Sequence, residues 1–173
     1  MISNIEKRQK KQLEAAEGFL SLGMPDHALD ALKQVSDFGS AEFYCHLLRG
    51  DAWRAKLEYE QALDCFLQAH ELKPQSLDAL MGMAWCYKRT DRVALSVECM
   101  RTAYQDHATE SIVLYNMACY LALDGNREQA LSWLGRALRM DKTLCKLVPA
   151  ETDFDSLKQD PDFQHLLELL SEE

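Results

Sequence analysis

The sequence lacks an apolar run long enough to cross a lipid bilayer, which takes about 20 consecutive apolar residues. The basic residues near the N-terminus are followed by no apolar stretch, so we expect no secretory signal. Cations are scarce as well, because 19 Lys and Arg stand against 28 Asp and Glu, for a net charge of −9. Nucleic acids and anionic membranes select basic faces, so neither is an expected partner. The sequence predicts a soluble, cytoplasmic protein.

Catalytic motifs are also missing. The chain has no glycine-rich phosphate loop, no His-Glu-x-x-His and no Gly-x-Ser-x-Gly, and its histidines are dispersed. Since a catalytic site needs converging groups, we expect no enzyme activity and no cofactor. The 6 cysteines form no Cys-x-x-Cys pair, and Cys65 and Cys99 occupy the same position in two copies of a sequence repeat. We therefore interpret the cysteines as structural thiols and expect no metal site.

The chain does contain a strong period, and residues 43–76 show its unit best. Small residues at Gly50 and Ala62 accompany bulky ones at Trp53 and Phe66. The offsets 46/50/53 and 62/66/69 are i, i+4 and i+7, so each half presents one face of an α-helix. A small residue in each half lets two helices approach closely. This pattern is typical of a tight antiparallel helix pair.

The unit recurs in four registers without an insertion, at 9–42, 43–76, 77–110 and 111–144. Five positions repeat in kind: Ala16/Gly50/Ala84/Ala118, Phe19/Trp53/Tyr87/Leu121, Ala28/Ala62/Ser96/Ala130, Leu32/Phe66/Met100/Leu134 and Val35/Ala69/Ala103/Ala137. The chain is 47% apolar and can bury a substantial core. A period of this length predicts a solenoid of helix pairs.

These residues resemble the tetratricopeptide repeat family, whose signature is W-x2-L-G-x2-Y, then A-x3-F, then P. The second copy carries it as His46-x2-Arg49-Gly50-x2-Trp53, Ala62-x3-Phe66 and Pro74. The third copy carries it as Leu80-x2-Met83-Ala84-x2-Tyr87 and Ser96-x3-Met100. The first copy departs from it, with Gln12 where a large residue belongs. The resemblance implies an all-α fold, a right-handed α-solenoid of four tandem helix-turn-helix repeats with a C-terminal capping helix.

We expect two parts, residues 1–144 with the repeats and a short polar N-terminal arm, and residues 145–173 as a capping segment. The helices should span about 9–22, 25–36, 43–56, 60–72, 77–90, 93–106, 111–123 and 127–140 by their caps and turn signals, with a break at Gly39-Ser40. Asp160 followed by Pro161 is a typical helix start. The cap should bury one apolar set: Phe154, Leu157, Phe163, Leu166, Leu167 and Leu170.

The resemblance also implies a binding surface, because the first helix of each pair lines the concave side in this family. The positions that point into this groove are, in the second to fourth repeats, Tyr44, Leu47, Asp51, Arg54, Met81, Trp85, Lys88, Arg89, Ile112, Tyr115 and Cys119. Trp85 and Tyr115 are candidate anchors for a bound peptide, although either ring could instead pack between helices. Arg54, Lys88 and Arg89 could favour an acidic ligand, unless Glu17 and Asp51 neutralise them.

The sequence therefore indicates a non-enzymatic module that binds a peptide or helical segment of a partner protein in its concave groove. Two alternatives stay open. One is a chaperone of the secretion type for an extended substrate segment, and the other is a self-associating structural subunit. The expected state is a monomer or a weak homo-oligomer.

Overall fold

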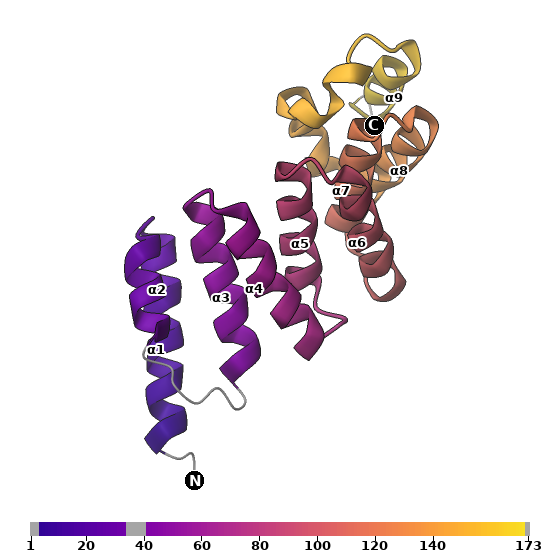
Figure 1. Cartoon of the computed structure of the whole chain (residues 1–173). Helices are drawn as coiled ribbons and strands as arrows, with labels where there is room; N and C mark the ends of the chain where they lie inside the picture. Colours follow the sequence, from indigo (N-terminus) through magenta and orange to yellow (C-terminus); the bar gives the residue numbers. More distant parts are fainter. Residues whose placement is uncertain (1–3, 34–40, 172–173) are drawn as a thin grey trace. The chain divides into compact units, whose positions relative to one another are not determined.

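A computed structural model describes residues 4–33 and 41–171 of the chain, with side chains for residues 7–33 and 41–169. This part is helical and contains no strand. Its α-helices, shown in Figure 1, are α1 (Asn4–Ser21), α2 (Pro25–Lys33), α3 (Glu42–Ala55), α4 (Tyr59–Leu72), α5 (Leu77–Arg89), α6 (Val93–Asp106), α7 (Ser111–Leu123), α8 (Arg127–Met140) and α9 (Pro161–Ser171). Among these described helices none is long and apolar enough to span a membrane.

The helix boundaries agree closely with those expected from the sequence, and the all-α helical-repeat class is confirmed. From α3 to α8 each end lies within one residue of the expected one. Helix α1 begins earlier than expected, at Asn4, because the polar N-terminal residues extend it. Helix α2 is described to Lys33, and the expected break at Gly39-Ser40 lies outside the described residues.

The repeated positions form the packing layer between helices. The small residues on the first helix of each pair are all buried: Ala16, Gly50, Ala84 and Ala118. The matching positions on the second helices are fully buried as well: Ala28, Ala62, Ser96 and Ala130, with Leu32, Phe66, Met100 and Leu134. Of the fifth position, Val35 lies outside the described residues, whereas Ala69, Ala103 and Ala137 are fully buried. The sequence repeat therefore reflects helices whose backbones pack closely against each other across small side chains.

The turns between paired helices also repeat. Gly23, Leu57, Asp91 and Gly125 occupy equivalent positions of the four repeats and all have left-handed backbone, with φ of 70°, 63°, 59° and 75°. In three of these turns the next N–H reaches back to a helix carbonyl, from Met24 to Phe19 at 2.8 Å, from Glu58 to Trp53 at 3.0 Å and from Asn126 to Leu121 at 2.8 Å. This is a C-terminal helix cap that usually takes glycine at the left-handed residue, because only glycine adopts it without steric strain.

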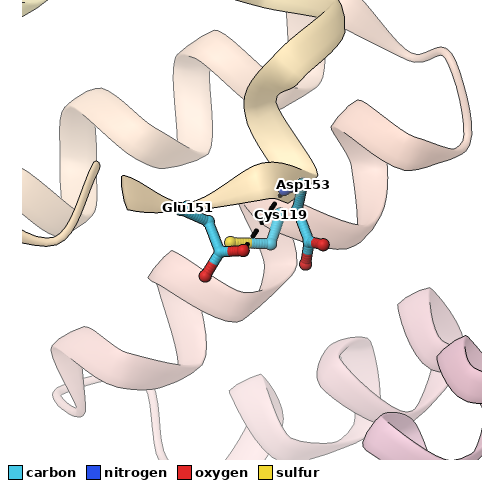
Figure 2. Close-up of side chains that lie close together, drawn as sticks. All are labelled: Cys119, Glu151 and Asp153. Carbon is cyan, nitrogen blue, oxygen red and sulfur yellow. Dashed lines mark hydrogen bonds between the residues drawn. The ribbon is translucent and has the colours of Figure 1, made fainter. Parts of the chain in front are cut away.

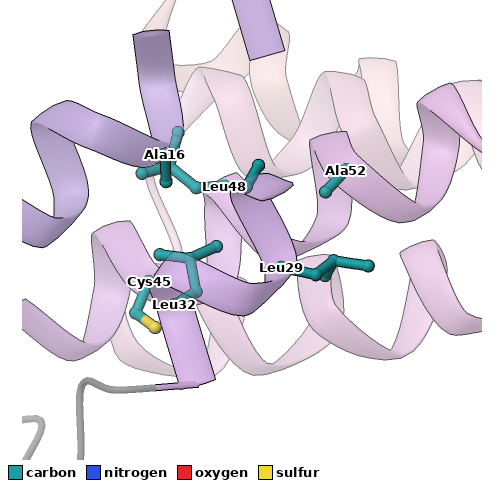
Figure 3. Packing of buried hydrophobic residues seen from close by; sticks show 7 residues of the cluster. Ala16, Leu29, Leu32, Cys45, Leu48 and Ala52 are labelled. Carbon is teal, nitrogen blue, oxygen red and sulfur yellow. The ribbon is translucent and has the colours of Figure 1, made fainter. Parts of the chain in front are cut away.

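The helices form two compact units, residues 1–90 with α1 to α5 and residues 91–173 with α6 to α9. The boundary falls between α5 and α6, which are the two helices of the expected third repeat. In the first unit, a cluster of buried residues joins α1, α2 and α3, and Figure 3 shows its packing: Ala16, Ala28, Leu29, Leu32, Cys45, Leu48 and Ala52.

Phe66 of α4 fills the space between α3 and α5 in the same unit. Its side chain is 1% exposed. A Cβ atom added to Gly50 or to Gly82 would lie 2.6 Å from Cε1 of the ring, which is too close for any side chain. The glycines therefore allow the ring to lie directly against both helix backbones.

In the second unit the chain after α8 folds back in short 3₁₀ turns, Lys142–Lys146, Val148–Ala150 and Thr152–Leu157, before α9. Phe154, Leu157 and Phe163 of the expected apolar set are buried, while Leu166 and Leu167 are half-buried. The side chain of Leu170 lies outside the described residues. The expected helix start is confirmed, because Asp160 accepts hydrogen bonds from the N–H groups of Asp162 at 2.9 Å and Phe163 at 3.3 Å.

Candidate partner-binding groove

The first unit carries two adjoining cavities, which together we call the groove. The first has a volume of about 380 Å³ and is lined by Glu17, Tyr44, Leu47, Leu48, Asp51, Arg54, Phe66, Asp78, Met81 and Gly82. The second has a volume of about 580 Å³ and is lined by Leu20, Ser21, Asp51, Arg54, Ala55, Leu57 and Trp85. The cavities adjoin because both are lined by Asp51 and Arg54.

Three helices supply most of the groove lining, each with one face, and Phe66 of α4 and Leu57 of the preceding turn complete it. On α3 the lining residues Tyr44, Leu47, Asp51 and Arg54 follow helical spacing, so their side chains share one side of the helix. Helix α1 adds Glu17 and Leu20, and α5 adds Asp78, Met81 and Trp85. Six of the sequence-predicted site residues therefore line the groove: Tyr44, Leu47, Asp51, Arg54, Met81 and Trp85.

Of the two sequence interpretations for the groove cations, the structure fits the one in which Asp51 neutralises Arg54. The guanidinium of Arg54 forms an ion pair with Asp51, with 2.8 Å between Nη2 and Oδ1. Burial raises the pKa of Asp51, the nearby Arg54 lowers it, and Asp78 raises it further. With Glu17 and Asp78 beside this pair, the lining carries three carboxylates and one guanidinium. The proposed preference for an acidic ligand at Arg54 is therefore not supported, since its charge is already paired.

Trp85 is the large aromatic residue of the second cavity. Its ring is half-buried and packs edge-on against Tyr59, with 5.3 Å between the ring centroids. The guanidinium groups of Arg54 and Arg89 lie over the ring, 5.5 Å and 5.7 Å from its centroid. Arg89 also donates a hydrogen bond of 3.1 Å to the Tyr59 hydroxyl. The two arginines therefore hold the indole in place and leave part of it open to the groove.

Leu57 is a groove residue that the sequence did not single out. It lines the second cavity, is 67% exposed and has the left-handed φ of 63°. Its repeat equivalents are glycine or aspartate, so a Leu at this register was the available signal. Leu20 and Asp78 were also missed, whereas Lys88 and Arg89 follow on the last turn of α5 and do not line either cavity.

Tyr115 and Cys119 do not lie on an open surface, which corrects the sequence assignment. Both are on α7 of the second unit, where they are only 3% and 2% exposed. The ring of Tyr115 packs edge-on against Phe154 from the chain after α8, with 5.9 Å between centroids. The segment that returns after α8 covers this side of α7. Of the two readings for Tyr115, packing is the one that fits.

Cys119 instead belongs to a polar cluster with Glu151 and Asp153, which Figure 2 shows in close-up. The ligand-type atoms of the three side chains all lie within 4.8 Å of one another. Glu151 accepts a hydrogen bond of 3.2 Å from the backbone N–H of Asp153. Burial raises the pKa of Tyr115, and the neighbouring Cys119, Glu151 and Asp153 raise it further. No sequence pattern predicted this cluster, because Cys119 lies far along the chain from Glu151 and Asp153.

The other cysteines behave as core residues. Cys45, Cys86 and Cys99 are buried, and Cys65 and Cys145 are half-buried. Burial raises the pKa of Cys65 to about 11 and that of its repeat equivalent Cys99 to about 12. Such thiols stay protonated near neutral pH and are poor nucleophiles.

No family model matches the chain, and no curated protein is significantly similar to it in sequence. Solved structures do match. The fold is similar to that of MamA. One MamA crystal structure has a TM-score of 0.71 and 17% identity, covering 80% of this chain and 81% of MamA. MamA MSR-1 has a TM-score of 0.71 and 16% identity over 95% of this chain and 97% of its own. A double mutant of MamA RS-1 gives 0.72 and 14% over 96% and 98%. At these identities the likeness to MamA is one of fold.

Proposed function

We propose that this protein is a non-enzymatic protein-binding module that holds a short segment of a partner in the groove of its first unit. Leu57 is the observation that carries the proposal. A leucine in left-handed backbone costs about 1–2 kcal/mol relative to ordinary helical backbone. This one also exposes its side chain to water at the edge of a cavity. Strain and exposed apolar surface at one residue favour a role in binding.

The groove favours a particular ligand chemistry. In the second cavity Leu20, Leu57 and the open part of Trp85 offer an apolar surface, which suits a large apolar side chain. In the first cavity Glu17 and Asp78 add negative charge beside the Asp51–Arg54 pair. A basic side chain would complement these carboxylates. The proposed ligand is therefore a segment that presents an apolar residue and a basic residue.

A peptide-display selection on the full chain tests this function. The dissociation constant of an enriched peptide is then measured by isothermal titration calorimetry. Trp85→Ala should raise it about thirtyfold, since a buried aromatic anchor is worth about 2 kcal/mol. Exchanging Glu17 and Asp78 for lysine should weaken binding of a basic peptide and reverse the sign of its salt dependence.

Trp133 provides a matched control in the second unit. It too is half-buried, lies 4.9 Å from a tyrosine ring, Tyr104, and has an arginine, Arg136, over it at 4.2 Å. Trp133→Ala should leave peptide affinity unchanged. Equal losses in the two variants, or a selection that enriches no peptide, would refute binding in the groove.

Two alternatives use the same module differently. A chaperone for an extended segment should bind long unfolded peptides much better than short ones, because several weak sites then act together. A self-associating subunit should increase in mean molecular mass with concentration in sedimentation experiments. If the subunits associate through the first helix pair, Trp85→Ala should leave that association intact. Peptide length series and sedimentation therefore separate these alternatives from a short-segment adaptor.

A further inference from the structure

The cluster around Cys119 has the composition of a metal site. Within the described part of the chain, Cys119, Glu151 and Asp153 are the one set of three such side chains found close enough to share an ion, within 4.8 Å. Figure 2 shows the Cys119 sulfur beside the Glu151 carboxylate, with the Asp153 carboxylate on the other side of the cysteine side chain. Cys119 and Asp153 are buried, and Glu151 is half-buried. An ion could therefore reach the cluster past Glu151.

A second observation points to a ligand at the same place. The hydroxyl of Tyr115 is buried and has no hydrogen-bond partner. Tyr115 lies four residues before Cys119, so the two side chains share one face of α7, one turn apart. A buried hydroxyl without a partner costs about 1–3 kcal/mol. A bound ion, with the water it carries, would give this hydroxyl a partner.

The elements that hold these groups are well anchored. Phe154, next to Asp153, is fully buried between the rings of Tyr115 and Phe163, at 5.9 Å and 5.7 Å. The hydrogen bond from the N–H of Asp153 to Glu151 sets the two carboxylates on one side of the turn. The site is thus formed by packing before any ion arrives, which lowers the entropy lost on binding.

We propose that Cys119, Glu151 and Asp153 bind one Zn²⁺ ion, with a water as the fourth ligand and the Tyr115 hydroxyl of α7 as the hydrogen-bond partner of that water. Zinc accepts thiolate and carboxylate ligands together, in tetrahedral sites with short bonds of about 2.0–2.3 Å. Magnesium and calcium favour sets made of oxygen alone, so the thiolate selects against them. The ion also offsets the repulsion between two neighbouring carboxylates in a poorly solvated place. Binding releases the thiol proton, so affinity should rise with pH.

The test uses the full chain after treatment with a chelator. Titration calorimetry with Zn²⁺ should give one ion per chain, and Co²⁺ should give the charge-transfer absorption of a cobalt–thiolate bond. Cys119→Ser should abolish that absorption and weaken Zn²⁺ binding by more than about tenfold. A tenfold loss is already usual when a residue that only hydrogen-bonds to a metal ligand is changed, and losing a ligand should cost more. Glu151→Gln should weaken Zn²⁺ binding while keeping the cobalt–thiolate band. Tyr115→Phe should reduce affinity about tenfold.

Cys99→Ser is the matched control, because Cys99 is a buried thiol of the same unit outside the cluster. It should leave stoichiometry, affinity and the cobalt spectrum unchanged. If Cys119→Ser fails to fold, Glu151→Gln still decides, since this side chain is half-buried and the substitution keeps its shape. Absence of saturable binding would overturn the proposal. Zn²⁺ binding that is unchanged in both Cys119→Ser and Glu151→Gln would also overturn it, because the ion would then be bound by other side chains.

Discussion

The ring of Phe66 lies so close to Gly82 that a Cβ on the glycine would be 2.6 Å from Cε1 of the ring. Gly50 stands in the same relation to the ring from α3. Phe66 and Gly82 also line the first cavity of the groove. The contact therefore sets how closely α5 approaches α4, and with it the position of the α5 residues that line the groove.

Gly82→Ala should destabilise the protein by about 1–3 kcal/mol, because the added methyl group overpacks a rigid, buried site. Urea denaturation followed by tryptophan fluorescence measures the loss. Adding Phe66→Leu to this variant should recover part of it. Gly18→Ala is the matched control, since a Cβ there meets nothing within 4 Å, and it should stabilise helix α1 by about 0.5–1 kcal/mol. Equal effects from both alanines would contradict the proposed contact.

Leu57→Gly should stabilise the protein by about 1 kcal/mol, because glycine relieves the left-handed backbone of the turn. The exposed side chain contributes little packing that could be lost. The same change should weaken peptide binding if Leu57 serves the groove, so stability and affinity should move in opposite directions. Thermal unfolding and titration of one variant measure both. A loss of stability would mean that Leu57 packs in the fold and is not held there for a ligand.

Asp160 should make stability depend on pH in the acidic range. Its hydrogen bonds to Arg127 lower the pKa of the Asp160 carboxyl from 3.8 to about 2, helped by the N–H groups of Phe163 and Asp162. A lowered pKa adds stability above the unfolded value and loses it as pH falls through the folded value. Asp160→Asn keeps a good N-cap but removes the charge. The stability difference between wild type and this variant should therefore be constant above about pH 5 and shrink between about pH 4 and pH 2.

Guanidinium denaturation at a series of pH values measures that difference. A matched comparison is Asp155→Asn, whose carboxylate forms an exposed pair with Lys158 at 2.6 Å. Exposed pairs of this kind contribute little, about 0–1 kcal/mol. A difference for Asp160→Asn that stays constant down to pH 2 would show that Arg127 does not hold the carboxylate as described.

Phe154→Ala should destabilise the second unit by about 3–5 kcal/mol, the usual loss for a fully buried aromatic ring. It should also uncover Tyr115, so binding of a hydrophobic dye should rise. Leu147→Ala, at a leucine that is 51% exposed in the same segment, should change stability by less than about 0.5 kcal/mol. Removal of residues 150–173 should act like Phe154→Ala and promote aggregation. An unchanged melting temperature after either change would exclude a capping role for the segment.

Tyr115→Phe should leave metal-free stability unchanged or raise it by up to about 1 kcal/mol, because the buried hydroxyl lacks a partner. With Zn²⁺ present the variant should gain less stability than wild type, since a weaker ligand shifts the equilibrium less. Melting curves with and without Zn²⁺ measure both quantities. A clear loss of metal-free stability would show that the hydroxyl already has a partner in the folded chain.

The repeat pattern was readable from the sequence because it reports contacts between neighbours in the chain. Ala62 and Phe66 have counterparts of the same kind in each register, and these positions are buried in every copy. Helix boundaries follow from caps and turns, which are also local. The face of α3 that lines the groove was predicted from the resemblance to tetratricopeptide repeats, and helical spacing is consistent with Tyr44, Leu47, Asp51 and Arg54 sharing that face.

Only part of the charge of the groove could be read in this way. The pairing of Arg54 with Asp51 is local, because the two residues lie three apart on α3, whereas the addition of Glu17 from α1 and Asp78 from α5 depends on how helices meet in space. Leu57 was hidden for a different reason. The expected residue at its turn is glycine, and the strain of a leucine there is a property of the backbone angle.

By itself the sequence determined the class of fold, the helices and the side of each helix that faces its neighbours, because these depend on periodic spacing along one chain. Tertiary structure alone decided which of those faces stay open. Residues 151–154 carry no repeat signal, yet they return to α7, cover Tyr115 and bring two carboxylates to Cys119. Contacts between segments without a shared period are set by packing in space, and spacing along the chain does not encode them.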